Sequence, residues 1–204
     1  DEASLRRGAP TPNALFGDRC GILLGDLAFA AALEETCRVS PRATRLLTEA
    51  VREMAVGEMQ ELFLRGSLNL SVDGYFGVAA RKTGALFEWI GRALSLHTLK
   101  PHRPADPVLL GRLAGVLLQA VDDIHDYSLA EAVAGKAPGR DLATGRLTLP
   151  GILAMDDEMT RQRFMALWER RGQPGVFEEA RALLEDGGHL ARARELARGV
   201  LGRM

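Results

Sequence analysis

Apolar residues recur at intervals of three and four along most of the chain, which is the spacing of a helix that buries one face. The pattern predicts long helices over residues 18–38, 42–65, 71–97 and 107–129. The first of these carries apolar residues on more than one face, so we expect it to be mostly buried. Shorter helices are predicted near residues 151–155, 158–170, 176–185 and 189–201.

Turn-forming and polar residues separate the predicted helices. Ser40 can cap the second long helix, with Pro41 at its first helical position. Residues 100–107 contain three prolines and are predicted to be a loop. We expect residues 1–13 to be a helix end followed by a loop. Residues 135–145, rich in Gly, Pro and charge, are predicted to form a long surface loop.

No segment shows convincing strand alternation, so the predicted fold class is all-α, a bundle of mostly antiparallel helices around a central cavity. The 204 residues suffice for one domain with a substantial core. We therefore expect a single all-α domain over residues 1–204. Because residue 1 is Asp and not Met, we also expect this domain to be truncated at its N-terminus.

Composition excludes several classes of protein. Hydrophobic residues make up 47% of the chain, which argues against disorder. The 26 basic and 27 acidic residues nearly balance, which argues against nucleic acid as a partner. No apolar run is long enough for a transmembrane segment, and no signal peptide is evident. Cys20 and Cys37 lack metal-ligand spacing, so we interpret them as reduced packing residues of a cytoplasmic protein.

The functional interpretation depends most on an acidic cluster in the helix over residues 107–129. Asp122 and Asp126 lie one helical turn apart on one face, and Asp123 lies about 100° round the helix. Like charges at this spacing are unfavourable unless they face water or hold a cation. Carboxylate oxygens suit Mg²⁺, which also binds substrate phosphates. A solvated acidic patch is the alternative interpretation.

Cationic residues elsewhere could bind phosphate groups. Arg6 and Arg7 precede a Gly/Pro turn, and Arg presents a planar fork to phosphate oxygens. Lys82 and Thr83 lie within an apolar helix, where the Lys either snorkels to solvent or faces a phosphate in a cleft. Further cations follow the acidic cluster, at Lys136, Arg140 and Arg146. Each of these features alone is also typical of an ordinary surface.

Together, these residues resemble the trans-isoprenyl diphosphate synthases, the polyprenyl synthetase family. The resemblance runs from Asp1 to about Asp157. The segment Asp122-Asp123-Ile124-His125-Asp126, preceded by Gln119, is similar to the second aspartate-rich motif of the family. Residues 1–8 resemble the end of the first such motif and its arginine pair. Further matches follow in family order: Leu23-Leu24-Gly25-Asp26, Gly57-Glu58-Met59, Lys82-Thr83-Gly84, Gly135-Lys136 and Gly145-Arg146-Leu147-Thr148-Leu149-Pro150.

The resemblance implies an enzyme that joins an allylic diphosphate to isopentenyl diphosphate with Mg²⁺ as cofactor. It implies that the metal is held by Asp1, Asp122, Asp123 and Asp126. It implies substrate binding by Arg6, Arg7, Lys82, Thr83, Gln119, Lys136 and Arg146, with Arg7 on isopentenyl diphosphate. Among these, Lys82, Gln119 and Asp122 are expected to be catalytic. Apolar helix faces would enclose the growing chain, and a homodimer is the expected assembly.

Two features depart from the family pattern. Leu118 stands where the family often has Phe, which changes the wall near the prenyl tail. Arg146 replaces a common lysine, which keeps the charge but changes its geometry. Two alternatives stay open: a terpene cyclase on the same fold, and a non-catalytic partner subunit of a heteromeric synthase. The arginine pair argues against the first, and the intact acidic cluster against the second.

Overall fold

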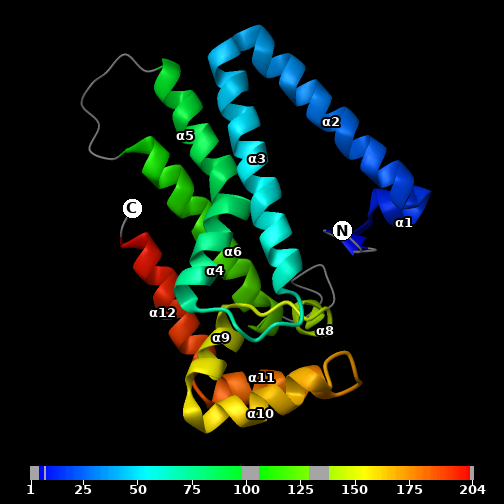
Figure 1. The fold of residues 1–204 in the computed structure, drawn as a ribbon, viewed down its shortest axis with the longest axis vertical. Helices are drawn as coiled ribbons and strands as arrows, with labels where there is room; N and C mark the ends of the chain where they lie inside the picture. Colours follow the sequence, from blue (N-terminus) through cyan, green and yellow to red (C-terminus); the bar gives the residue numbers. More distant parts are fainter. Residues whose placement is uncertain (1–4, 7, 98–105, 129–137, 203–204) are drawn as a thin grey trace.

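The computed structural model describes residues 5–6, 8–97, 106–128 and 138–202, and within them the chain is almost entirely helical (Figure 1). The long helices are α2 (Asp18–Val39), α3 (Pro41–Leu64), α5 (Ala85–His97) and α6 (Pro107–Ser128). The shorter ones are α1 (Pro12–Phe16), α4 (Val72–Ala79), α8 (Arg140–Ala143), α9 (Leu149–Asp156), α10 (Glu158–Glu169), α11 (Val176–Asp186) and α12 (His189–Leu201). The all-α class is confirmed.

Local sequence accounts for where α3 and α4 begin. The Ser40 hydroxyl accepts a hydrogen bond from the Ala43 N–H at 3.3 Å, with Pro41 opening α3, as predicted. Ser71 caps α4 in the same way through the Gly74 N–H at 3.1 Å. The predicted helix over residues 71–97 is interrupted by a π-helical turn, η1 (Ala80–Gly84), which the sequence pattern did not reveal. Such turns are frequent at functional sites.

The start of the described chain differs from its prediction. Where a helix end and loop were expected, the two-residue strands β1 (Leu5–Arg6) and β2 (Ala9–Pro10) pair in antiparallel fashion. Gly8, at φ 75°, lies in the connecting turn, where a positive φ suits glycine.

The main core lies where the C-terminal half of α6 meets α9 to α12. Tyr127 of α6, Ile152 and Leu153 of α9, and Phe164 of α10 are at most 1% exposed there. The described part of the predicted surface loop belongs to this core as well. Arg140–Ala143 forms a helical turn with Asp141 and Leu142 buried, so that part of the loop prediction was wrong.

Helix α2 is not buried by the rest of the chain, contrary to expectation. It leans outward and packs against α1 and α3 (Figure 1). Several large apolar side chains on it are exposed: Ile22, Leu23, Leu24, Leu27 and Phe29. Cys20 is half-buried, but Cys37 is exposed and so is not a packing residue within the chain. No helix among the described residues is both long and apolar enough to cross a bilayer.

Candidate active site

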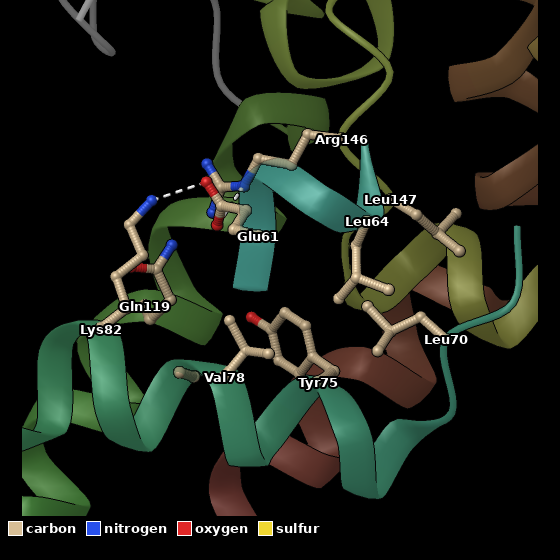
Figure 2. Close-up of a pocket in the computed structure, with 10 residues that line it drawn as sticks. Glu61, Leu64, Leu70, Tyr75, Val78, Lys82, Gln119, Arg146 and Leu147 are labelled. Atoms are coloured by element: carbon tan, nitrogen blue, oxygen red, sulfur yellow. Dashed lines mark hydrogen bonds and ion pairs between the residues drawn. The ribbon is translucent and has the colours of Figure 1, made fainter. Parts of the chain in front are cut away.

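A small pocket lies between α3, the α4–η1 segment, α6 and the residues just before α9 (Figure 2). One side is apolar and the other carries charged and amide groups, which all point into the same space. The apolar side is formed by Leu64, Leu70, Val78, Ala79 and Leu147. The polar side is formed by Glu61, Lys82, Gln119 and Arg146, with the Tyr75 ring below them. The combination suits a ligand with an anionic head and an apolar body.

Glycine at position 57 lets α3 and η1 approach each other closely enough to build this pocket. A Cβ on Gly57 would lie 2.5 Å from the Lys82 backbone nitrogen. A second close approach joins η1 to α6, where a Cβ on Gly115 would lie 2.7 Å from the Gly84 Cα. The backbones of three helical segments therefore meet around Lys82 and Thr83.

Lys82 reaches carboxylates of α3 from η1. Its Nζ lies 2.7 Å from Glu61 Oε1 and 3.0 Å from Glu58 Oε2, and its side chain is 22% exposed. Lys82 is therefore held by two anions at the pocket edge rather than extending freely into water. An anionic ligand in the pocket would compete with these carboxylates for the ammonium group.

Arg146 is enclosed by three carboxylates. Its Nε lies 3.0 Å from Glu61 Oε2, and its two terminal nitrogens lie 2.9 Å from Asp123 Oδ1 and 3.1 Å from Asp141 Oδ1. Burial lowers the pKa of Arg146, but the three carboxylates outweigh that effect and raise it. All three guanidinium nitrogens already face an acceptor, so a phosphate would have to replace one of them.

Asp123 is fully buried and receives three donors. Tyr75 donates its hydroxyl to Oδ2 at 2.7 Å, while the Gln119 amide donates to Oδ1 at 2.9 Å alongside Arg146. Burial raises the pKa of Asp123 to about 6, against the lowering effect of the Arg146 charge. Both oxygens of Asp123 are thus engaged inside the protein.

The other acids of the cluster occupy different environments. Asp122 is exposed. Asp126 is 1% exposed, and its Oδ2 accepts a long hydrogen bond of 3.4 Å from the Asp141 N–H. Across residues 5–6, 8–97, 106–128 and 138–202, no three His, Cys, Asp or Glu side chains are grouped to hold a metal ion. The metal role of these acids stays a prediction.

Thr83 and Gln119 are brought together across the η1–α6 contact. The Thr83 hydroxyl donates to Gln119 Oε1 at 2.8 Å. Gln119 thereby links the Lys82-Thr83 segment to the acidic helix, as expected of residues serving one site. The remaining candidates cannot be placed in the same way. Asp1, Arg7 and Lys136 lie outside the described residues, and only the backbone of Arg6 is described, in β1.

Sequence reasoning missed three residues that organise this site. Glu61 lies one turn beyond Glu58 on α3, and that spacing was a usable signal. Asp141 was read only as part of a charged loop. Tyr75 lies two turns before Lys82 in an apolar stretch, where an aromatic residue indicates a core position and nothing more.

The fold and this site together define an all-α isoprenoid synthase type of protein, and the comparisons with known proteins agree. The sequence profile described as polyprenyl synthetase matches residues 1–184. The chain belongs to the polyprenyl synthetase family.

Individual relatives are similar over most of the chain. A prenyl transferase from Synechocystis is 32% identical over 200 residues, which cover 97% of this chain and 61% of that protein. Component 2 of the heptaprenyl diphosphate synthase from Geobacillus stearothermophilus is 31% identical, covering 82% of this chain and 53% of that protein. The crystal structure of a polyprenyl synthase from Caulobacter crescentus, complexed with calcium and isoprenyl diphosphate, superimposes with a TM-score of 0.87 at 31% identity. That match covers 97% of this chain and 62% of the other. The chain therefore spans little more than half the length of these proteins.

Proposed function

We propose that this chain forms the catalytic part of a Mg²⁺-dependent trans-prenyltransferase, which condenses an allylic diphosphate with isopentenyl diphosphate to a longer polyprenyl diphosphate. Lys82 and Thr83 of η1 meet Gln119 of the acidic helix α6, and this arrangement supports the proposal most. A cation, a hydroxyl and an amide at the edge of an apolar pocket match the needs of an allylic diphosphate. Family membership supports the same reaction.

In this proposal, the diphosphate head is bound by Lys82 and Thr83, with Arg6 and Lys136 as further cations and Arg7 on isopentenyl diphosphate. Lys82 would exchange its contact with Glu58, whose side chain is 49% exposed, for a phosphate oxygen. This exchange costs little because an exposed ion pair is weak. Gln119, one turn before Asp123, would assist near the reacting end of the allylic chain.

Arg146 has a second role that its contacts favour. Because its nitrogens bind Glu61, Asp123 and Asp141, it fixes the carboxylates of three separate segments around the pocket. Direct contact between Arg146 and a diphosphate stays a prediction, and it requires the loss of one of these pairs. Breaking one of these ion pairs would leave a largely buried carboxylate without its cation, which is unfavourable.

The donor set on α6 fits magnesium in part. Asp122 and Asp126 would supply oxygen ligands one turn apart, and Mg²⁺ typically takes one or two carboxylates together with substrate phosphates. Asp123, with both oxygens engaged, fits a supporting role better than a direct one. When bound, the metal supplies Lewis-acid stabilisation of the charge that develops on the departing diphosphate. Lys82 adds positive charge on the same group, and the apolar pocket wall excludes water from the allylic carbon.

The direct test is an assay of the full chain with an allylic diphosphate, labelled isopentenyl diphosphate and MgCl₂. The proposal expects label in a longer prenyl diphosphate and none without Mg²⁺. A terpene cyclase would instead release a hydrocarbon from the allylic diphosphate alone. Label that never enters a longer product, at any allylic chain length, would reject the prenyltransferase.

A heteromeric synthase is the second candidate, because one of the relatives is named as component 2 of such an enzyme. We also propose a homodimer in the cytoplasm, with the apolar face of α2 as the contact between copies. The exposed Ile22, Leu23 and Leu27 support this assembly, since a patch of that kind on a monomer is unfavourable. Light scattering on the purified chain separates the two assemblies. A dimer active by itself supports the homodimer, and an inactive chain that gains activity only with a second subunit supports the heteromer.

A further inference from the structure

Tyr75 lies beneath the pocket, and its only polar group points at the acidic helix. The residue is 6% exposed, and its hydroxyl donates to Asp123 Oδ2 at 2.7 Å. Burial, followed by the nearby charge of Asp123, raises the pKa of Tyr75 well above its usual value. The phenol hydroxyl is the donor in this contact.

Asp123 also accepts a hydrogen bond from Gln119, which connects Tyr75 to that amide. Gln119 presents its amino group to Asp123 Oδ1 at 2.9 Å, where the carboxylate oxygen accepts the hydrogen bond. The carbonyl oxygen of Gln119 then faces Thr83, which donates its hydroxyl proton to it. Hydrogen bonds thus join Tyr75, Asp123, Gln119 and Thr83 in sequence, and the donors converge on Asp123, from Tyr75 on one side and from Thr83 through Gln119 on the other.

Each link of this chain has a fixed direction. Arg146 also donates to Asp123 Oδ1, so the amide nitrogen of Gln119 shares that oxygen with a guanidinium nitrogen. The second oxygen, Oδ2, is held by Tyr75. Without the phenol, the carboxylate could rotate toward Arg146, and the amide would lose its fixed partner.

We propose that Tyr75 is a positioning residue, which acts through Asp123 to set the orientation of the Gln119 amide in the pocket and of the Thr83 hydroxyl bonded to it. The inference rests on the proposed function for its effect on turnover, but the orientation itself does not depend on the reaction. A preorganised amide and hydroxyl contribute to catalysis because they need no reorientation as charge develops.

A purely structural role for the ring is the competing explanation. Tyr75 packs edge-on against Phe76, with ring centroids 5.4 Å apart, and belongs to the main core. The substitution Tyr75→Phe keeps the ring and removes only the hydroxyl. Thr160→Val is the matched control, since it also removes a buried hydroxyl. The Thr160 hydroxyl donates to the Ala154 carbonyl at a distance of 2.9 Å, and neither residue lines the pocket.

The kinetic test compares both variants in the full chain. We expect Tyr75→Phe to lower kcat roughly ten- to a hundredfold with the KM for the allylic diphosphate nearly unchanged, because misplacement of a positioned group affects the reacting state most. Thr160→Val should leave kcat unchanged. The proposal is overturned if Tyr75→Phe leaves kcat unchanged, or if it raises KM and leaves kcat intact.

The coupling to Gln119 gives a second measurement that a structural role would not affect. In a Gln119→Met background, Tyr75→Phe should cost less than about twofold in kcat, because the two residues act through one chain of contacts. The same full loss in that background would contradict the proposal.

A third readout is independent of turnover. The chain has four Gln residues, so the side-chain amide signal of Gln119 can be assigned by NMR from the Gln119→Met variant. We expect Tyr75→Phe to shift this signal and to speed its hydrogen exchange, and Thr160→Val to do neither. An unchanged Gln119 amide signal in Tyr75→Phe overturns the inference, even if the proposed reaction is correct. A shifted signal in a chain that transfers no prenyl group would instead sustain the inference and reject only the proposed function.

Discussion

Glu61 of α3 and Lys82 of η1 form an ion pair in which Nζ lies 2.7 Å from Oε1. The second oxygen of Glu61 receives Arg146 Nε at 3.0 Å, so one carboxylate holds two cations at fixed positions beside the pocket. Its side chain is only 14% exposed, which keeps both interactions from being fully screened by water. Glu61 thereby balances the positive charges of Lys82 and Arg146 at the proposed diphosphate site.

Glu61→Gln keeps the shape of this side chain and removes its charge. We expect a loss of about 1–2 kcal/mol in the free energy of unfolding, because two partly buried cations lose their shared partner. The KM for the allylic diphosphate should fall, since the loss of the Glu61 charge leaves Lys82 and Arg146 more attractive to an anionic head. Urea unfolding and steady-state kinetics measure both effects.

Glu58→Gln is the matched control, because Glu58 contacts the same Lys82 from a side chain that is 49% exposed. Its cost in stability should be below roughly 0.5 kcal/mol. Equal losses from the two substitutions, or a higher KM in Glu61→Gln, would contradict the role given to Glu61.

Lys82→Met keeps the aliphatic stem and removes the charge of the lysine. We expect kcat/KM to fall by at least about a hundredfold, with thermal stability nearly unchanged, because the lost interaction is made chiefly with the reacting diphosphate. Arg81→Met is the control, as the neighbouring residue of the same π-turn faces Glu53 at 3.9 Å and is 46% exposed. A matching fall in melting temperature and turnover in Lys82→Met would instead indicate that the lysine serves packing, by snorkelling.

Gly57→Ala tests the close approach of α3 and η1. The new Cβ would lie 2.5 Å from the Lys82 nitrogen, so the two segments must separate. We expect a destabilisation of about 2 kcal/mol or more, with loss of activity, as for other overpacked contacts. Gly77→Ala on α4, where a Cβ meets nothing within 4 Å, should instead stabilise the helix by about 0.5–1 kcal/mol. A stable, active Gly57→Ala variant would show that α3 and η1 tolerate a wider spacing.

The helices were predictable because their pattern is local. Apolar spacing and caps such as Ser40 fix where α3 and α6 run, and the structure agrees with those predictions within a few residues. The π-turn at Lys82 was not predictable, because the apolar pattern continues through it; it lies where η1 packs closely against Gly57 and α6. The prediction that α2 is mostly buried was wrong for a related reason. An apolar face on a helix does not show whether the same chain or another molecule covers it.

The site was predictable in its residue types but not in its contacts. Lys82, Thr83, Gln119 and the acidic cluster were found by motif, and the structure brings the first three together. The links through Glu61, Tyr75 and Asp141 join residues far apart in sequence, such as the 48 positions between Tyr75 and Asp123. Pairings of this range depend on tertiary packing, which no spacing rule in one sequence reveals.

The raised pKa of Asp123 predicts a pH dependence of stability. Its pKa in the folded chain is about 6, against 3.8 for the unfolded residue. A carboxyl with a raised folded pKa favours the folded state below the unfolded pKa, and this contribution is lost as the pH rises through about 6. The stability of the wild type relative to Asp123→Asn should therefore fall between pH 4 and pH 7, by roughly 3 kcal/mol at most. Urea titrations of both proteins across this range measure it, and a difference that rises with pH would contradict the assignment.

In the proposed enzyme, the acids of α6 and the cations of the pocket together hold a metal-bound allylic diphosphate. Thermal unfolding with a non-hydrolysable allylic diphosphate, with and without Mg²⁺, tests it most directly, because a ligand that binds only the folded state raises the melting temperature. We expect a clear rise in melting temperature with both ligands together and a much smaller rise with either alone. The joint effect should be lost in Asp122→Asn. It should persist in Glu195→Gln, a control on the exposed face of α12. An equal rise without Mg²⁺, or an undiminished joint effect in Asp122→Asn, would contradict the claim.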